Sequence, residues 1–285
     1  MEHIRQAVEL AKAQSGGLPK PPASAKPNTP PHDSGAVMGP GERNEGVRSD
    51  SDRTDGSVVA LDPKHLESMR IIAHNVLDLR SRAYDMLRTQ VLRAMAAEKW
   101  QLIGVTSPTA GCGKTLTSVN LAMSIARQQD KSALLVDLDL QRPQVAKTLG
   151  LKPQQGLFGA LEGKMTLPDA ILRAQIGNHQ ISLLPCETST SHSSEWCASH
   201  EMGSLIRDIR TYCRSQIAII DLPPVLTGDD VISILPHLDC VILVTAVGVS
   251  TTSDIERCKR HLQSTEVVRV VLNKSAEQGV EHYYY

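Results

Sequence analysis

The sequence of 285 residues predicts an α/β fold, in which a mostly parallel β-sheet carries helices on both faces. Three observations predict it. Six short segments are apolar almost throughout, as expected for strands that are buried on both sides. Segments with helical periodicity lie between them. A glycine-rich turn joins the first apolar segment to a helical one, and sheets of this kind bind ligands beyond the carboxyl ends of their strands.

The expected elements follow the chain in a regular order. A helix is expected over residues 79–97, before the first strand. The strands are expected at 101–106, 132–137, 180–185, 216–221, 239–245 and 266–272. The helices between them are expected most clearly at 114–128, 201–213 and 251–263. This alternation of strands and helices is typical of a parallel sheet.

Three flanking segments differ in composition from this core. Residues 1–14 have apolar residues at helical spacing, which predicts a short amphipathic helix. Residues 15–63 are rich in Gly, Pro, Ser and Asp, and they predict a disordered linker that cannot bury enough apolar area to offset its chain entropy. The folded domain is expected over 64–275, and residues 276–285 are expected to form a flexible tail.

The overall composition excludes several classes of function. A net charge of −1 and an aromatic content of 3% argue against a nucleic-acid partner. The sequence contains no run of about 18 apolar residues, so no membrane span is predicted. The N-terminus lacks the pattern of a secretory signal. The six cysteines show no CxxC spacing, which predicts reduced thiols and a cytoplasmic location.

The glycine-rich turn after the first strand predicts a phosphate-binding P-loop. Its glycines allow backbone N–H groups to surround phosphate oxygens at the start of the next helix. Lys114 is expected to reach the β- and γ-phosphates of ATP, and the Thr115 hydroxyl is expected to bind Mg²⁺. The expected nucleotide contacts are Gly111, Cys112, Gly113, Lys114, Thr115 and Leu116. Because Pro108 stands where the motif begins with Gly, a glycine-rich turn before a solvated lysine is the alternative.

Carboxylates end two of the expected strands. Asp137 closes the strand 132–137, Asp139 follows it, and Asp221 closes the strand 216–221. A charge at the end of an apolar strand must be paired or hydrated. Three carboxylates at one sheet edge beside a P-loop predict a magnesium–triphosphate site. Helix capping or turn formation is the alternative role for each of them.

Four motifs in this order resemble the bacterial tyrosine kinases, which are P-loop kinases of capsule and exopolysaccharide export. The motifs are SPTAGCGKT, LLVDLDLQRP, IIDLPP and the terminal tyrosine run, and the resemblance covers roughly residues 70–285. The N-terminal MEHIRQAVELAKAQ and the linker also resemble the exosortase-associated branch of this family. That branch lacks membrane spans of its own and works beside a separate chain-length-determinant membrane protein.

The resemblance implies an ATP-dependent protein-tyrosine autokinase that regulates exopolysaccharide or capsule synthesis and export. Its implied phosphate acceptors are Tyr283, Tyr284 and Tyr285 at the C-terminus. It also implies a homo-oligomer that is cytoplasmic and is recruited to the inner membrane through its partner protein.

The resemblance also assigns roles to the strand-end residues. It gives Asp137 and Asp139 base and metal duties, and it gives Asp221 to the metal. Asp137 is the favoured acceptor of the tyrosine proton, since a phenol is mostly protonated at neutral pH. Asn273, at the end of the last strand, is expected to contact the nucleotide base. The lysine and threonine of the P-loop keep the nucleotide and metal roles given above.

The sequence departs from the family pattern in three places, one of which is that the terminal tyrosine run is short. Gln141 occupies the usual position of an arginine, and Arg142, one position later, is predicted to take its catalytic role. The family's oligomerisation helix reads Glu-x-x-Arg-x-x-Arg, whereas this chain has Arg82, Asp85 and Arg88. A reciprocal swap of charges predicts an intersubunit ion pair, and a solvated helix face is the alternative.

Two other functions stay open at this point. One is an ATPase switch of the partitioning or division-site type, which carries a signature lysine where this chain has Thr109. The other is a catalytically weak ATP-binding regulator of polysaccharide assembly, which Gln141 favours. The segment 193–195 resembles a family segment near the site, although Ser194 equally suits a helix cap.

Overall fold

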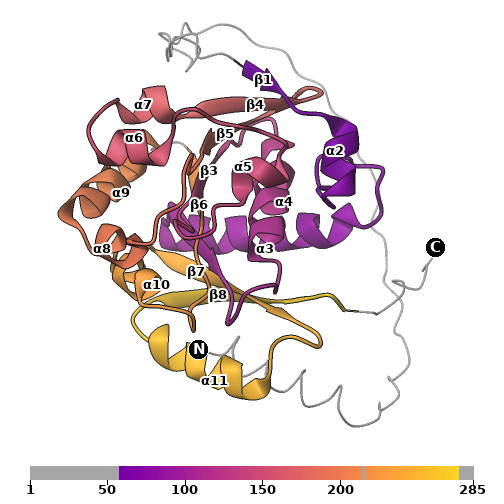
Figure 1. The fold of residues 1–285 in the computed structure, drawn as a ribbon. Coiled ribbons are helices and arrows are strands. Elements are labelled where there is room, and N and C mark those ends of the chain that lie inside the picture. Colours follow the sequence, from indigo (N-terminus) through magenta and orange to yellow (C-terminus); the bar gives the residue numbers. More distant parts are fainter. Residues whose placement is uncertain (1–57, 214–215, 276–285) are drawn as a thin grey trace, which may run out of the picture.

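The centre of the protein is an eight-stranded β-sheet, which the computed structural model describes within residues 58–213 and 216–275 (Figure 1). The strands are β1 (Val58–Ala60), β2 (Leu102–Thr106), β3 (Ala133–Asp137), β4 (Leu172–Ile176), β5 (His179–Leu184), β6 (Ile217–Asp221), β7 (Cys240–Ala246) and β8 (Glu266–Asn273). Their order across the sheet is β1-β4-β5-β3-β6-β2-β7-β8. Only β4 and β5 pair antiparallel, so the predicted mostly parallel sheet is confirmed.

Helices cover both faces of this sheet, as predicted (Figure 1). They are α2 (Pro63–Ser68), α3 (Ser81–Glu98), α4 (Lys114–Ala126), α5 (Val145–Thr148), α6 (Leu157–Leu161), α7 (Leu167–Ala170), α8 (Ser193–Cys197), α9 (His200–Tyr212), α10 (Asp230–Ile234) and α11 (Thr252–His261). Helices α2 to α5 share one hydrophobic core, and α6 to α11 share the other. Consecutive strand residues alternate between the cores, so Leu102 packs in one and Ile103 in the other.

The predicted strands are all present, and none of their ends differs by more than one residue. The long helices α3, α4, α9 and α11 also occupy their predicted places. The hairpin of β4 and β5 was only half predicted, because β4 is partly polar and does not read as an apolar run. Gly177, with a φ of +54°, and Asn178 connect its strands. A Gly-Asn pair is a hairpin signal that the apolar pattern alone does not use.

The folded region begins earlier than predicted. Residues 58–63 were assigned to the disordered linker, but β1 pairs parallel with β4 and extends the sheet to a further strand. The Leu61 N–H continues this pairing by donating to the Gln175 carbonyl at 2.8 Å. Asp62 then caps α2, whose first residue is Pro63. The predicted helix at 1–14, the linker up to residue 57 and the tail at 276–285 lie outside the described residues.

Asp85 contradicts the idea of a solvated face on α3. Its carboxylate accepts a hydrogen bond from Ser124 at 2.7 Å and pairs with Arg127 at 3.0 Å, and both partners belong to the α4 region. Arg88 pairs with the same carboxylate at 3.1 Å and also donates to the Ser124 carbonyl. These contacts fasten α3 to α4 within the chain, so Asp85 and Arg88 have a structural role here. Arg82 is exposed, and oligomerisation stays a prediction.

The carboxylate of Asp239, the residue before β7, contacts both the start of β2 and helix α9. It accepts N–H bonds from Gln101 at 2.7 Å and Leu102 at 2.8 Å, and Arg210 of α9 pairs with both of its oxygens at 2.9 and 3.0 Å. Partial burial by itself would raise the pKa of Asp239, but Arg210 and the two N–H groups hold that pKa below its usual value. The ionised form therefore stabilises the fold.

We expect Asp239→Asn to lower the free energy of unfolding by about 2 kcal/mol at pH 7, since it removes a bidentate ion pair. A lowered pKa means that the stabilisation is present above the unfolded-state pKa and is lost as the pH falls through the folded-state pKa. The gap between wild type and variant should therefore shrink below about pH 4. Urea denaturation at pH 7 and pH 3.5 measures the free energy of unfolding of wild type and variant. Asp130→Asn, which affects an exposed pair with Lys131 at 3.7 Å, is the control. Equal stabilities of wild type and Asp239→Asn at pH 7 would contradict the assignment.

Among the described residues, no helix combines the length and the apolar character needed to cross a membrane.

Candidate active site

The predicted P-loop connects β2 to the N-terminus of α4. Gly111 and Gly113 have φ values of +80° and +95°, which L side chains rarely adopt. Gly113 is the N-cap residue of α4, and no side chain caps this helix end. The first N–H groups of α4 are therefore not satisfied by a capping side chain, and the positive end of a 13-residue helix faces the cleft. This arrangement favours an anionic ligand.

Asn273 supports the P-loop from behind. Its Nδ2 donates to the Cys112 carbonyl at 2.9 Å, and a Cβ atom at Gly113 would lie 2.1 Å from the same nitrogen. The Cys112 side chain is buried, with its sulfur 3.4 Å from the Ser250 hydroxyl. Cys112 can therefore meet a nucleotide through its backbone alone. In this structure the Asn273 amide contacts the loop, and its predicted contact with the base stays a prediction.

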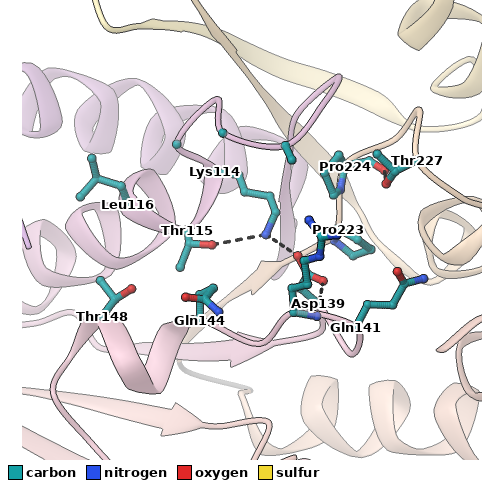
Figure 2. Close-up of a pocket in the computed structure, with 14 residues that line it drawn as sticks. Lys114, Thr115, Leu116, Asp139, Gln141, Gln144, Thr148, Pro223, Pro224 and Thr227 are labelled. Atoms are coloured by element: carbon teal, nitrogen blue, oxygen red, sulfur yellow. Dashed lines mark hydrogen bonds and ion pairs between the residues drawn. The ribbon is translucent and has the colours of Figure 1, made fainter. Parts of the chain in front are cut away.

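Lys114 lies between two of the predicted carboxylates. Its Nζ is 2.8 Å from Asp139 Oδ2 (Figure 2). The same nitrogen is 3.5 Å from Asp221 Oδ2. Burial alone would lower the pKa of Lys114, but Asp221 and Asp139 raise that pKa above its usual value. The ammonium group therefore stays charged in a site where only 12% of its side chain is exposed.

Asp221 is the centre of a hydroxyl network at the start of α4. Thr115 Oγ1 donates to Asp221 Oδ2 at 2.6 Å, and Ser118 Oγ donates to Asp221 Oδ1 at 3.0 Å. Burial raises the pKa of Asp221, while Lys114 and both hydroxyl groups act in the opposite direction. Thr115 and Asp221 thus supply two hard oxygen ligands side by side, which is the ligand type that Mg²⁺ prefers.

Asp137, like Asp221, is absent from the surface that lines the cleft described below. It is fully buried, and its Oδ2 accepts N–H bonds from Gln144 at 3.0 Å and Val145 at 2.9 Å. Asp137 and Asp221 are register partners on the neighbouring strands β3 and β6, as the meeting of parallel strand ends predicts. Burial and then the nearby Asp221 raise the pKa of Asp137 to about 8. In this structure the Asp137 carboxylate fixes the loop that follows β3.

A cleft of about 480 Å³ opens above these residues (Figure 2). Its walls come from the P-loop, the start of α4, the loop after β3, α5 and the loop after β6. The lining residues are Ala110, Gly111, Gly113, Lys114, Thr115, Leu116, Asp139, Gln141, Arg142, Gln144, Thr148, Pro223, Pro224 and Thr227. One wall thus carries helix-end N–H groups and an ammonium, and the other carries a carboxylate and amides. Such a cleft can hold a polyphosphate beside a proton acceptor.

Within the described parts of the chain, no three His, Cys, Asp or Glu side chains are placed to hold a metal ion by themselves. A magnesium ion in this cleft would therefore rely on one or two protein oxygens, with phosphate oxygens and water as the remaining ligands. That is the usual arrangement for Mg²⁺ in nucleotide sites.

Comparisons with known proteins identify the family of this site. A protein-family model described as ParA, NUBPL iron-transfer P-loop NTPase, matches residues 99–278. The tyrosine-protein kinase CpsD of Streptococcus pneumoniae serotype 4 is 30% identical over 194 residues, which cover 67% of this chain and 82% of that protein. The chain belongs to the ParA-type P-loop NTPases and, among them, to the bacterial tyrosine kinases.

Other relatives of this kinase family show how much of a longer protein the chain represents. The tyrosine-protein kinase wzc of Salmonella typhi is 27% identical over 212 residues, which cover 74% of this chain but only 29% of that protein. The solved kinase domain of VpsO is 28% identical with a TM-score of 0.60, and the match covers 73% of this chain and 98% of that domain. The chain therefore spans less than a third of wzc and nearly all of the solved VpsO domain.

The likeness to a division-site ATPase concerns the fold. The septum site-determining protein MinD of Pyrococcus horikoshii, solved as a complex with Mg-ADP, is 22% identical with a TM-score of 0.53. The match covers 62% of this chain and 72% of that chain. Thr109 occupies the position at which a partitioning ATPase was expected to carry a lysine.

All six cysteines are buried, and the described residues contain no cluster suited to a metal ion. Burial raises the pKa of Cys197 to about 12, with smaller contributions from Asp230 and Asp229, so this thiol stays protonated at neutral pH.

The structure brings most of the predicted site residues together. Gly111, Gly113, Lys114, Thr115, Leu116, Asp139 and Arg142 line the cleft, and Asp221 lies directly beneath it. Three predicted residues lie outside the cleft wall: Asp137 is behind the loop after β3, Asn273 is behind the P-loop, and the Cys112 side chain is buried. The predicted acceptors Tyr283, Tyr284 and Tyr285 lie outside the described residues.

Several residues of the candidate active site were not predicted. Ser118 binds Asp221, and its position one helical turn after Lys114 could have indicated this. Gln141 was noted only as a missing arginine, but its amide donates to Ser193 at 2.8 Å and lies 3.4 Å from Asp230. These partners are distant in the sequence, so no local pattern indicated the contact.

Proposed function

We propose that the chain is an ATP-dependent protein-tyrosine autokinase that phosphorylates Tyr283, Tyr284 and Tyr285. The observation that carries this proposal is the P-loop lysine, whose Nζ lies 2.8 Å from Asp139 and 3.5 Å from Asp221, in a chain of the bacterial tyrosine kinase family. The regulation of exopolysaccharide or capsule synthesis and export is part of the same proposal, and it rests on the family resemblance.

ATP is the proposed phosphate donor, with Mg²⁺ as the metal. The fit is supported by the positive φ of Gly111 and Gly113, the uncapped end of α4 and the hard oxygens of Thr115 and Asp221. MinD, which shares the fold, was solved with Mg-ADP. When bound, the metal neutralises charge on the phosphate oxygens. Thr115 and Asp221 are the proposed ligands, with Asp139 within reach of the same region.

The protein groups divide the work of the transfer. Lys114 and the N–H groups of the P-loop stabilise the charge that spreads over the phosphoryl oxygens. The tyrosine oxygen forms a bond to the γ-phosphorus as the bond from that phosphorus to the bridging oxygen breaks. The electron pair of the broken bond leaves with ADP, and the phenol proton passes to a carboxylate. We assign that proton to Asp139 rather than to the predicted Asp137, because Asp139 lines the cleft and Asp137 is occupied by two N–H groups.

Arg142 keeps its proposed catalytic role. It is exposed and lines the cleft, and its N–H fixes it beside Asp139 by donating to that carboxylate at 3.1 Å. A guanidinium in this position can approach a phosphoryl oxygen. The resemblance favours transfer between copies of the chain in a homo-oligomer.

The test of this function is a phosphosite map of the purified chain incubated with ATP and Mg²⁺. We expect mass spectrometry to find phosphate on residues 283–285, and the triple Tyr→Phe variant to lose it while it still binds ATP. Tyr84 is an internal comparison, because it is partly buried against the core. To test transfer between copies, the triple variant is mixed with Lys114→Met, whose intact tail should then become phosphorylated. Full ATP binding without phosphate on residues 283–285 would contradict the kinase proposal.

A catalytically weak regulator is the second candidate, and Gln141 is the observation that favours it. The amide of Gln141 is directed to Ser193 and Asp230, so the usual arginine charge is missing from this position. The same phosphosite map separates the two candidates, since a regulator would bind ATP with little transfer.

The finer family assignment also belongs to this proposal. We infer from the resemblance that the chain is of the exosortase-associated type, cytoplasmic, and recruited to the inner membrane by a chain-length-determinant protein. Because β1 belongs to the sheet, a recruiting segment would have to end before Val58. Equal membrane recruitment with and without residues 1–57 would count against this role for the N-terminal segment.

A further inference from the structure

Gln141 stands between the cleft and a buried carboxylate. It is exposed and lines the cleft, whereas Asp230, behind it, is only 3% exposed and does not reach the cleft wall. Figure 2 shows the Gln141 side chain extending away from Lys114, toward the side of the cleft where Thr227 lies. The residue therefore belongs to the half of the cleft opposite the P-loop.

The surroundings of Gln141 determine which way its amide turns. Ser194 donates to Asp230 Oδ1 at 2.7 Å, and the other carboxylate oxygen of Asp230 lies 3.4 Å from Gln141 Nε2. The Ser193 hydroxyl, 2.8 Å from Nε2, can accept or donate and does not decide the orientation. The carboxylate does decide it, because a carbonyl oxygen turned toward Asp230 would place two acceptors against each other.

The amide oxygen of Gln141 is thereby left for the cleft. Among the described residues nothing donates to Oε1, and the side chain is exposed where it lines the wall. An arginine in this place would offer only donors, which suit phosphate. Gln141 offers an acceptor instead, which suits an N–H or O–H group of a peptide.

We infer that Gln141 is a substrate-positioning residue, whose Oε1 accepts a hydrogen bond from the acceptor tyrosine segment while Asp230 and Ser193 hold its amide in place. The inference rests on the proposed kinase function and names the side of the cleft that receives the peptide. It assigns Gln141 to peptide binding and leaves nucleotide binding to the P-loop.

The experiment uses the full chain with its three terminal tyrosines changed to Phe, so that its own tail does not compete. The probe is a synthetic peptide of residues 274–285, KSAEQGVEHYYY. For Gln141→Ala we expect kcat/KM for the peptide to fall on the order of five- to tenfold, as for the loss of one hydrogen bond. The Kd of a fluorescent ATP analogue should change less than about twofold, since the lost contact involves no phosphate. The exposed Gln155→Ala is the matched control and should leave both quantities unchanged.

Two further variants keep the inference open to refutation. Asp230→Asn should also reduce kcat/KM for the peptide, and adding it to Gln141→Ala should cause little further loss, because both act through one amide. Gln141→Arg should weaken peptide transfer, since it replaces the acceptor by donors. Unchanged peptide kinetics in Gln141→Ala, a weakened ATP analogue in that variant, or faster transfer by Gln141→Arg would each overturn the inference. A parent chain that binds ATP but phosphorylates no peptide would overturn the kinase function itself, and this inference with it.

Discussion

Lys114→Met is expected to reduce the rate of phosphate transfer on the order of 100- to 1,000-fold, because it removes a group that stabilises charge in the transition state. Lys114 is the cation that lies between Asp139 and Asp221, and methionine keeps much of its length without the charge. Without that ammonium, the two carboxylates would repel an incoming triphosphate. Transfer to the peptide of residues 274–285 and binding of a fluorescent ATP analogue measure the two effects separately.

The control for this change is Lys131→Met. Lys131 is exposed and, within the described part of the chain, forms an ion pair with the exposed Asp130 alone, at 3.7 Å, so transfer should stay at the wild-type level. Thermal unfolding of both variants shows whether the fold is intact. Transfer by Lys114→Met at more than half of the wild-type rate would remove Lys114 from the mechanism.

Gly113→Ala is expected to weaken nucleotide binding by on the order of 100-fold, since two separate costs act on the same loop. A φ of +95° strains any residue with a Cβ atom, and this Cβ would lie 2.1 Å from Asn273 Nδ2. Asn273 cannot turn away freely, because the same nitrogen donates to the Cys112 carbonyl. The loop must therefore shift, which moves the N–H groups that face the phosphates.

Gly163→Ala is the matched control. Gly163 also has a positive φ, +68°, but nothing lies within 4 Å of the position that a Cβ atom would take there. That variant should therefore keep nucleotide affinity and lose only about 1 kcal/mol of stability. Adding Asn273→Ala to Gly113→Ala removes the clash but not the strain, and should restore part of the affinity. Titration with a fluorescent ATP analogue measures all three variants. Wild-type affinity in Gly113→Ala would show that the loop is not the phosphate cradle.

The predicted parts of the fold are those that depend on runs of similar residues. Strands such as β3 and β6 are buried on both faces, so their sequences are apolar throughout and their ends are easy to find. β1 has three residues and β4 alternates with polar side chains, so neither stands out from its surroundings. Helices α5 to α8 and α10 have four or five residues each, which is too short for a helical period to repeat.

The neighbourhood of the site residues follows from the strand ends, whereas their positions relative to the cleft depend on the loops. That Asp137 and Asp221 are neighbours follows from parallel pairing, and the register confirms it. Which carboxylate faces the cleft depends on the loop after β3, where Asp137 is taken up by Gln144 and Val145. The role of Gln141 depends on residues about 50 and 90 positions away, whose approach only the folded chain reveals.

The strand order places the two ends of the described domain at opposite edges of the sheet. β1 and β8 form opposite borders of the sheet, so whatever precedes Val58 and whatever follows Ser275 are attached on opposite flanks of the domain. A partner that binds the residues before Val58 therefore need not block access to the residues after Ser275. The proposed anchoring through residues 1–57 and the proposed phosphorylation of the tail would therefore start from points that the domain keeps apart.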